Sequence, residues 1–266
     1  MRGCGVLLAI GLFILSAEAG PVPPSPALGY HLVFADDFKH FDLSPDGRGE
    51  HAWYEGVWFN HRHAPLANIA VTNEGLDLIW TRGQDTPDTS ISTFARNGAE
   101  SHSWRYGYFE VRMKWNPVRG AWPAVWLVPA YAGHLAESGE LDVFEGNGDN
   151  PQVFNGTIHD WKAGPDDQDK MQDVSNTGKS NRFSLSWGTD LREYHTYGML
   201  WEPDKITWFF DNKPLHSEPS YAIFGKQNYC LIIGMQEGAD WKEGNLDRVT
   251  SSRMDLNVQW ARVWQK

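Results

Sequence analysis

The sequence is poor in cysteine, and this absence excludes a fold held together by disulfide bonds. Only Cys4 and Cys230 occur among the 266 residues. Cys4 lies in an apolar N-terminal segment, and Cys230 lies in a short apolar run that is typical of a buried strand. We therefore expect Cys230 to be a buried thiol without a partner, in a domain that packing alone must stabilise.

Basic residues are also scarce. The chain has 23 Lys and Arg against 34 Asp and Glu, a net charge of -11. Long-range repulsion then disfavours nucleic acid and anionic membranes as partners. Zinc-ligand spacing, a P-loop and a dinucleotide-binding glycine pattern are missing as well. We therefore expect a protein that needs no cofactor.

Long apolar runs are limited to one, at residues 6–15, which follows Met1-Arg2 and precedes an Ala-x-Ala site ending at Ala19. The run is too short to span a bilayer and is typical of a cleaved secretory signal. The sequence predicts a signal peptide at residues 1–19, a proline-rich linker at 20–28 and one domain at 29–266. We expect a secreted monomer, extracellular or periplasmic.

Aromatic residues are abundant, with 14 Trp, 13 Phe and 9 Tyr. Short alternating runs of apolar and polar residues are separated by Gly, Pro, Asn and Asp, and no long window has a helical period. Roughly a dozen strands without intervening helices predict an all-β protein, a β-sandwich jelly roll of two antiparallel sheets. About 240 residues is a normal length for one such domain.

The densest acidic group is Glu140, Asp142 and Glu145, within one expected strand. Alternation places Glu140 and Asp142 on one face and Glu145 on the other, unless one residue near Val143 or Phe144 is bulged. A bulge would put three carboxylates on one face, where mutual repulsion raises at least one pKa. A solvated edge strand protected by its acids is the alternative interpretation.

Paired carboxyl groups cleave glycosidic bonds, because one donates a proton to the leaving group while the other attacks or activates water. Glu140 and Glu145 are the candidate pair, and the charge of Asp142 between them would keep Glu145 protonated and orient Glu140. Trp122 and Trp126, just upstream, offer aromatic faces on which sugars stack. They share a face if their strand is unbulged, and Trp126 suits a core position equally well.

The segment Glu140-Leu-Asp-Val-Phe-Glu145 resembles the signature of glycoside hydrolase family 16, in the form with the extra bulge residue. Four further motifs are similar to this family in the same order, beginning at Tyr106, Gly120, Gly156 and Tyr194. The resemblance implies a concanavalin A-like jelly roll with a concave substrate cleft, and a retaining mechanism.

The resemblance also implies roles for single residues. Glu140 would be the nucleophile, Glu145 the general acid/base and Asp142 the assisting carboxylate. Trp122 would stack on the sugar beside the scissile bond, with Trp126 close by. His159 matches the family's histidine on the strand after the acids, so we expect it near the acid/base.

Further substrate contacts are expected from Asn60, at a distal subsite, and from Trp241. Trp161 and Trp241 both fall in expected loops, where they suit either sugar platforms or hydrophobic plugs. Gln259 stands where relatives often carry an Asp that helps bind a structural calcium, so the resemblance does not carry that site over. Asn155 begins an Asn-Gly-Thr glycosylation sequence, but its closeness to the expected cleft argues against modification.

The sequence thus predicts a secreted, endo-acting, retaining glycoside hydrolase of a β-linked polysaccharide, with β-1,3- or mixed-linkage β-1,3/1,4-glucan preferred. One alternative is a non-catalytic, lectin-like carbohydrate-binding domain. A transglycosylase or a galactan hydrolase would use the same site residues.

Overall fold

The computed structural model describes residues 24–57, 62–95, 102–131, 137–163, 171–173, 181–186, 188–238 and 251–266. These residues are mainly strand, with short 3-10 helices at Ser25–Ala27, Leu66–Asn68 and Ala222–Gly225. Among the residues so described, no helix is long and apolar enough to cross a membrane. The expected signal peptide lies outside them, so its assignment stays a prediction.

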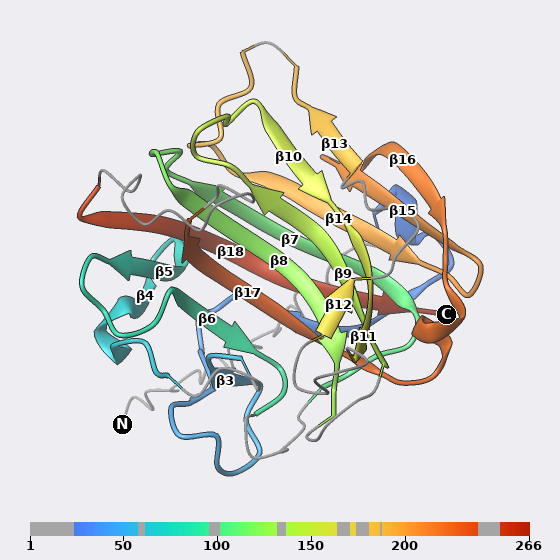
Figure 1. The fold of residues 1–266 in the computed structure, drawn as a ribbon, viewed down its shortest axis with the longest axis horizontal. Helices are drawn as coiled ribbons and strands as arrows, with labels where there is room; N and C mark the ends of the chain where they lie inside the picture. The colour runs from blue at the N-terminus through green and yellow to red at the C-terminus, as the bar shows by residue number, and fades with distance from the viewer. Residues whose placement is uncertain are drawn as a thin grey trace, which may run out of the picture.

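Two large sheets make up the molecule (Figure 1). The eight strands of the first, here called sheet A, are β1 (His31–Asp36), β4 (Ile69–Thr72), β5 (Gly75–Thr81), β7 (Gly107–Trp115), β14 (His195–Trp201), β15 (Lys205–Phe210), β16 (Lys213–Pro219) and β18 (Arg253–Gln265). They run in the order β16-β15-β14-β7-β18-β5-β4, with β1 also paired to β18, and all their pairings are antiparallel.

The second sheet, sheet B, contains β2 (Leu43–Ser44), β3 (Trp53–Glu55), β6 (Asp88–Ser92), β8 (Ala121–Pro129), β9 (Glu137–Gly146), β10 (Val153–Gly156), β11 (Ile158–Ala163), β12 (Met171–Asp173), β13 (Asn181–Ser184) and β17 (Tyr229–Glu237). Its main order is β12-β11-β9-β8-β17-β6-β3-β2, and β10 joins β13 to β9. Only the short β2–β3 pair is parallel among the pairings described. The predicted all-β sandwich is confirmed.

The core lies between the sheets and is built by strict alternation. On β7 the side chains of Phe109, Val111, Met113 and Trp115 are buried in the main core cluster, where they pack with apolar residues of sheet B. Cys230 is also buried, as expected, but it faces the other side of sheet B in a small apolar cluster. The sandwich therefore buries apolar side chains between its sheets and also under part of the outer face of sheet B.

One prediction about the elements was wrong. Residues 160–181 are rich in Gly, Asp and Lys, and the sequence predicts a long loop there, of which 164–170 and 174–180 lie outside the described residues. In the structure β11 continues to Ala163 and pairs with both β9 and β12. Trp161 therefore lies on a strand, and its side chain has a position fixed by the sheet.

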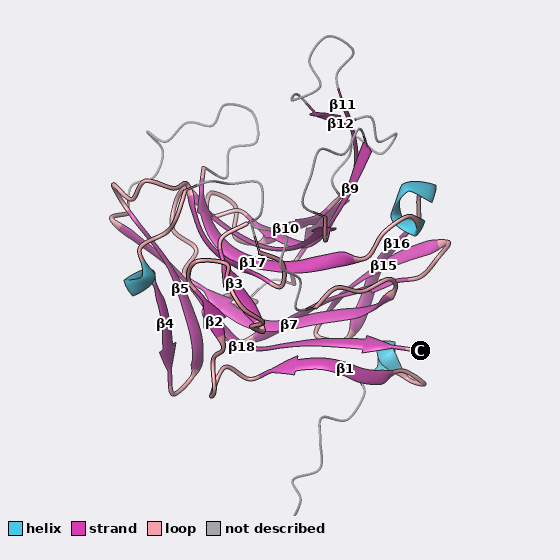
Figure 2. Cartoon of the chain, turned by 90° about the horizontal axis from the view of Figure 1, so that it is seen from below, coloured by secondary structure: helices cyan, strands magenta, loops and turns pink. Residues whose placement is uncertain are grey.

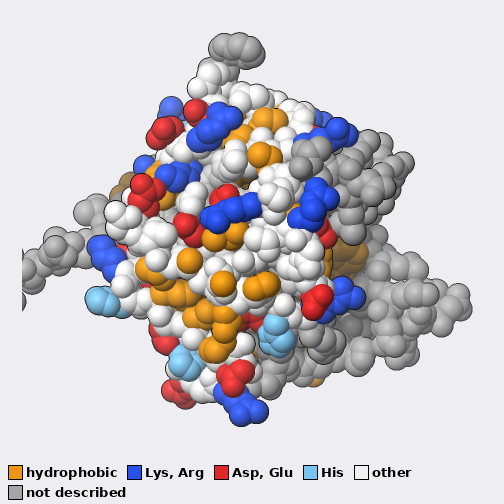
Figure 3. Space-filling view, turned by 90° about the vertical axis from the view of Figure 1, so that its left-hand side faces the viewer, with side chains coloured by type: hydrophobic (Ala, Val, Ile, Leu, Met, Phe, Trp, Pro, Cys, Tyr) orange, Lys and Arg blue, Asp and Glu red, His pale blue; other side chains and the backbone are white. Residues whose placement is uncertain are grey.

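The outer surface carries mixed charges. Figure 3 shows acidic and basic side chains interspersed around a band of hydrophobic ones, on the face at the left of Figure 1. The large hydrophobic side chains exposed among the described residues are Leu28, Val33, Leu66, Val71, Tyr131 and Leu215. The net negative charge is thus not gathered on this face.

Strand β9 contains the bulge that the spacing of its acids predicts. Against β8, Phe144 pairs with Val125 and Asp142 pairs with Trp126, so Val143 is the extra residue. Val143 and Phe144 both face the core, with 1% and 0% of their surface exposed. The alternation slips by one residue, and Glu145 comes to the same face as Asp142.

On its other edge β9 passes from pairing with β11 at Leu141 to pairing with β10 at Glu145, and a residue of the other sheet bonds to the main chain between these pairings. Trp208 of β15 crosses the core and donates its indole N–H to the main-chain carbonyl oxygen of Asp142, at 2.8 Å. The Asp142 N–H in turn donates to the carbonyl of Thr157, at 2.9 Å. Both main-chain groups at the bulge are therefore satisfied in a buried environment, which a buried peptide group requires.

Substituting Trp208→Phe should destabilise the protein by more than the loss of ring volume, since a buried carbonyl loses its donor at a cost of about 1–3 kcal/mol. Trp201→Phe is the matched control, because Trp201 is equally buried and its indole nitrogen makes no hydrogen bond with any described residue. Urea unfolding of both variants measures the difference. Equal losses of unfolding free energy would show that the hydrogen bond contributes nothing.

Candidate active site

Three carboxyl groups project from β9 on the outer face of sheet B. In Figure 2 sheet B lies above sheet A, and strands β9 and β11 curve up and away from sheet A. The Asp142 and Glu145 residues are 2% and 5% exposed, whereas the side chain of Glu140 is 21% exposed. This face of β9 thus carries two buried acids, Asp142 and Glu145, and one partly exposed acid, Glu140.

Glu145 is held by two hydrogen bonds. The hydroxyl of Thr157 donates to Oε2 at 3.1 Å, and the indole N–H of Trp122 donates to Oε1 at 3.3 Å. Thr157 begins the segment that leads into β11, and Trp122 lies on β8, so neighbours on both sides of β9 fix this carboxyl group. Sequence reasoning missed Thr157, since a threonine carries no signal until the pairing of the strands is known.

The environment raises the pKa of Glu145 well above its ordinary value. Burial is the largest cause, and the charges of Asp142 and Glu140 act in the same direction. His159 and the hydrogen bond from Thr157 oppose the shift. The surroundings of Glu145 therefore favour its protonated form.

Glu140 has a different set of neighbours. The indole N–H of Trp161 donates to its Oε2 at 2.7 Å, a short bond that suits an ionised carboxylate. The His159 Nε2 atom lies 4.0 Å from Glu140 Oε1. Trp161 thus binds Glu140, and its expected role as a sugar platform or a hydrophobic plug stays a prediction.

His159 lies beside Asp142 and Glu140. Its Nε2 atom is 3.2 Å from Asp142 Oδ2, and its ring stacks on that of Trp161 with centroids 5.0 Å apart. Its close carboxylate neighbours are Asp142 and Glu140, and its charge lowers the pKa of Glu145, so the expected position beside the acid/base stays a prediction. A contact between His159 and substrate stays a prediction.

Trp122 and Trp126 share the outer face, because the register of β8 against β17 is unbroken from Ala121 to Pro129. Trp126 pairs with Asp142 across the strands and packs on the outer-face cluster that contains Cys230. Trp126 is half-buried, so part of its ring packs in this cluster and part stays exposed on the face that carries the acids. The sequence left open whether it is a core or a site residue. Asn60 and Trp241 lie outside the described residues, and their sugar contacts stay predictions.

Gln259 does not offer the ligand that a calcium ion requires. Its Oε1 atom accepts a hydrogen bond from Arg112 Nε at 2.7 Å. The oxygen is neutral and already engaged by a cation, whereas calcium sites are built from several oxygens that include carboxylates. Gln259 as it stands therefore does not fit the ion. The wider expectation that the protein needs no cofactor stays a prediction.

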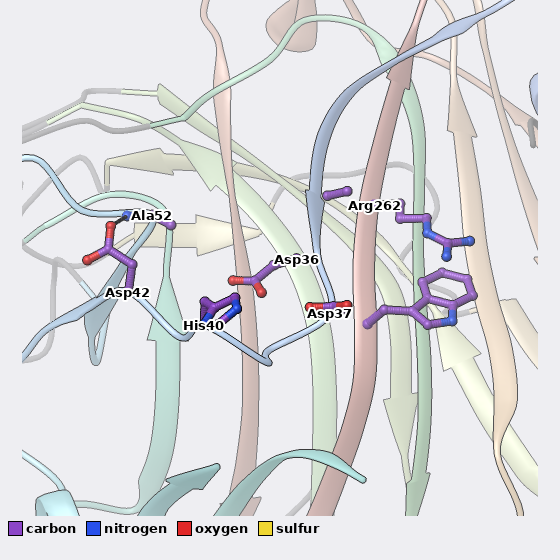
Figure 4. A pocket seen from close by; sticks show the side chains of 8 residues that line it. Asp36, Asp37, His40, Asp42, Ala52 and Arg262 are labelled. Atoms are coloured by element: carbon purple, nitrogen blue, oxygen red, sulfur yellow. Dashed lines mark hydrogen bonds between the residues drawn. The ribbon is translucent and has the colours of Figure 1, made fainter. Parts of the chain in front are cut away.

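A pocket of about 500 Å³ lies elsewhere, beside β1 and β18. Figure 4 shows three of its acids, Asp36, Asp37 and Asp42. Asp36 accepts hydrogen bonds from the N–H groups of Phe38 and Trp53, and Asp42 accepts one from Ala52. These carboxylates stabilise the chain segment that connects β1 to β3. The acids of this pocket therefore have a structural role.

Two carboxyl groups on one face of a β-sandwich, one of them with a raised pKa, are typical of carbohydrate-cleaving enzymes that act through paired acids. The sequence matches the family model "Glycosyl hydrolases family 16" over residues 67–261, well over half of the chain. The chain belongs to glycosyl hydrolases family 16, and it is a glycoside hydrolase that acts on polysaccharide.

Individual relatives agree with this assignment. The chain is 26% identical to "Beta-glucanase" of Rhodothermus marinus over 98% of this chain and 86% of that protein. It is 33% identical to "Glucan endo-1,3-beta-glucosidase" of Cryptopygus antarcticus over 70% and 71% of the two chains. The laminarinase catalytic domain of Thermotoga maritima superposes with a TM-score of 0.68 at 20% identity, covering 89% of this chain and 98% of that one. The last comparison shows the fold, the jelly roll that the sequence predicts.

The electrostatic account of Glu145 predicts opposite effects for two isosteric substitutions. Asp142→Asn should lower the pKa of Glu145, because a neighbouring negative charge is removed. Thr157→Val should raise it, because the ionised form loses a hydrogen-bond donor. The pKa can be read from the ¹³C chemical shift of the Glu145 carboxyl group, assigned with Glu145→Gln. Shifts in the same direction in both variants would contradict this account.

Proposed function

We propose that this glycoside hydrolase is a secreted, endo-acting, retaining enzyme that cleaves β-1,3- or mixed-linkage β-1,3/1,4-glucan. The observation that carries the chemistry is the bulge at Val143, which gathers Glu140, Asp142 and Glu145 on one face with different surroundings. The glucan preference is supported by the names of the relatives, which are β-glucanases. Secretion is supported by the signal-like N-terminus at residues 1–19.

In the first step Glu140 attacks the anomeric carbon with a carboxylate lone pair, and the bond to the leaving oxygen breaks. Glu145 gives its proton to that oxygen, so the leaving sugar departs as a neutral alcohol. The product on the enzyme is a glycosyl ester of Glu140. The Trp161 N–H bond to Oε2 fixes the carboxylate, and burial keeps the proton on Glu145 until the transfer.

In the second step a water molecule attacks the anomeric carbon and the ester bond to Glu140 breaks. Glu145, now ionised, takes a proton from the water and returns to its starting form. Two inversions leave the product with the configuration of the substrate. Trp122 donates to Glu145 from the strand beside it, so its indole lies where the departing sugar would pass.

A lectin-like domain is the competing proposal. Binding alone gives no reason to bury a carboxyl group at 5% exposure next to two other acids, where its pKa is raised at a cost in stability. Enzymes place such groups in sites that transfer protons. The arrangement therefore favours catalysis, and a transglycosylase would differ only in the acceptor of the second step.

Glu140→Gln should lower the rate of polysaccharide cleavage by roughly a thousandfold or more, since the amide is not a nucleophile. Glu137→Gln is the matched control on the same strand, because Glu137 pairs with Lys226 at the far side of the site. The substrates are laminarin, mixed-linkage glucan, xyloglucan, agarose and carrageenan, with products separated by size. Glu140→Gln should still bind oligosaccharide.

Two outcomes would overturn parts of this proposal. Full activity of Glu140→Gln would remove the nucleophile assignment. Release of no product from any polymer by the unsubstituted protein, together with retained binding, would favour the lectin-like domain. Cleavage of the galactans alone would replace glucan by galactan as the substrate.

The retaining mechanism predicts that the first product formed from a β-glucan carries the β configuration at its new reducing end. Proton NMR of the anomeric signals during the first minutes of the reaction measures this, before mutarotation mixes the two forms. An initial excess of the α form would indicate direct attack by water and would exclude a glycosyl ester on Glu140.

A further inference from the structure

We propose that Glu140, Asp142 and His159 form a binding site for a divalent first-row transition-metal ion of the zinc and copper class. One ligand atom from each residue lies within 4.8 Å of the others. The His159 Nε2 atom is 3.2 Å from Asp142 Oδ2 and 4.0 Å from Glu140 Oε1. Two ligands that each lie about 2.1 Å from one ion can be at most roughly 4.2 Å apart, so both distances are compatible with a shared ion.

Asp142 supplies the second observation. Its Oδ2 atom is buried, in a residue that is 2% exposed, and it accepts no hydrogen bond from any residue that the structure describes. His159 Nε2 is close to this atom without the alignment of a hydrogen bond. A buried carboxyl oxygen without a donor is costly, and a cation placed between it and the imidazole nitrogen would remove that cost.

The donor set selects the kind of ion. One imidazole nitrogen and two carboxylate oxygens suit zinc, copper, nickel and cobalt. Calcium takes six to eight oxygens, and magnesium keeps most of its waters, so neither is matched by this set. Among divalent ions the affinity should follow the usual order, with copper bound most tightly and manganese weakly.

Strand pairing brings the three ligands together before any ion binds. Glu140 and His159 are directly paired across β9 and β11, and Asp142 follows on the same face of β9. The ring of His159 is held by stacking on Trp161. Glu140 is the most exposed of the three. A small rotation of its side chain brings its carboxylate oxygen within reach of an ion held by Asp142 and His159.

Metal binding would block catalysis, because the ion would occupy the carboxylate that attacks the sugar. Added zinc should then inhibit competitively with polysaccharide, and EDTA should restore the rate. This consequence rests on the proposed function. Binding of the ion rests on the geometry alone and can be measured without substrate.

The test is a titration of the full-length protein, expressed without metal additives, with ZnCl₂ in a calorimeter. His159→Gln should raise the Kd for zinc by at least about tenfold, because a ligand is lost. His216→Gln is the matched control, since His216 is exposed and, within the described part of the chain, pairs with a single carboxylate, Glu218, at 2.8 Å. Asp142→Asn is a second variant that should also weaken binding.

Electron paramagnetic resonance of the Cu²⁺ complex at one equivalent should show coupling to one histidine nitrogen, which His159→Gln removes. An unchanged zinc Kd in a folded His159→Gln protein, or no binding below about 1 mM in the unsubstituted protein, would overturn the proposal. Zinc binding that depends on His159, in a protein that cleaves no polymer, would leave this site standing while the proposed function falls. Cleavage of a polymer by a protein that binds no zinc would support the proposed function and overturn the metal site.

Discussion

The hydrogen bond from the Trp208 indole to the main-chain carbonyl of Asp142 is the interaction on which the site depends. It satisfies a main-chain carbonyl at the edge of β9 where the pairing passes from β11 at Leu141 to β10 at Glu145. Without the bulge, Glu145 would point into an apolar core, where a carboxyl group is costly. The chemistry on sheet B is thus supported by a side chain of sheet A, which explains why both layers of the sandwich matter to a site that lies on only one.

Much of the architecture can be predicted from the alternation of apolar and polar residues and from the spacing of the acids in the sequence. The alternation along β7 assigns Phe109 and Val111 to the core, and the phase of the acids predicts a bulge next to Val143. The prediction at β11 was wrong because that stretch has little apolar alternation. Its strand is formed by pairing with β9 and β12, and such pairing depends on partners distant in the sequence.

The electrostatics of the site could be predicted only in outline. Mutual repulsion of the acids was expected, but burial proves to be the largest cause of the raised pKa of Glu145. The donors Thr157 and Trp161 come into contact with the acids through the register of β9 against its neighbours. A single sequence does not display that register, so these contacts and the position of His159 beside Asp142 emerge only from the folded chain.

The hydroxyl of Thr157 has a second consequence, through the Asn-Gly-Thr sequence that it completes. Asn155 pairs directly with Glu145 across β10 and β9, so the two side chains share a face. A host cell that attaches oligosaccharides to such sequences would place a branched chain beside Glu145. Bacterial expression, or Asn155→Gln in a eukaryotic host, avoids this steric obstruction. The threonine that donates to Glu145 is therefore also the residue that makes Asn155 an acceptor for such a chain.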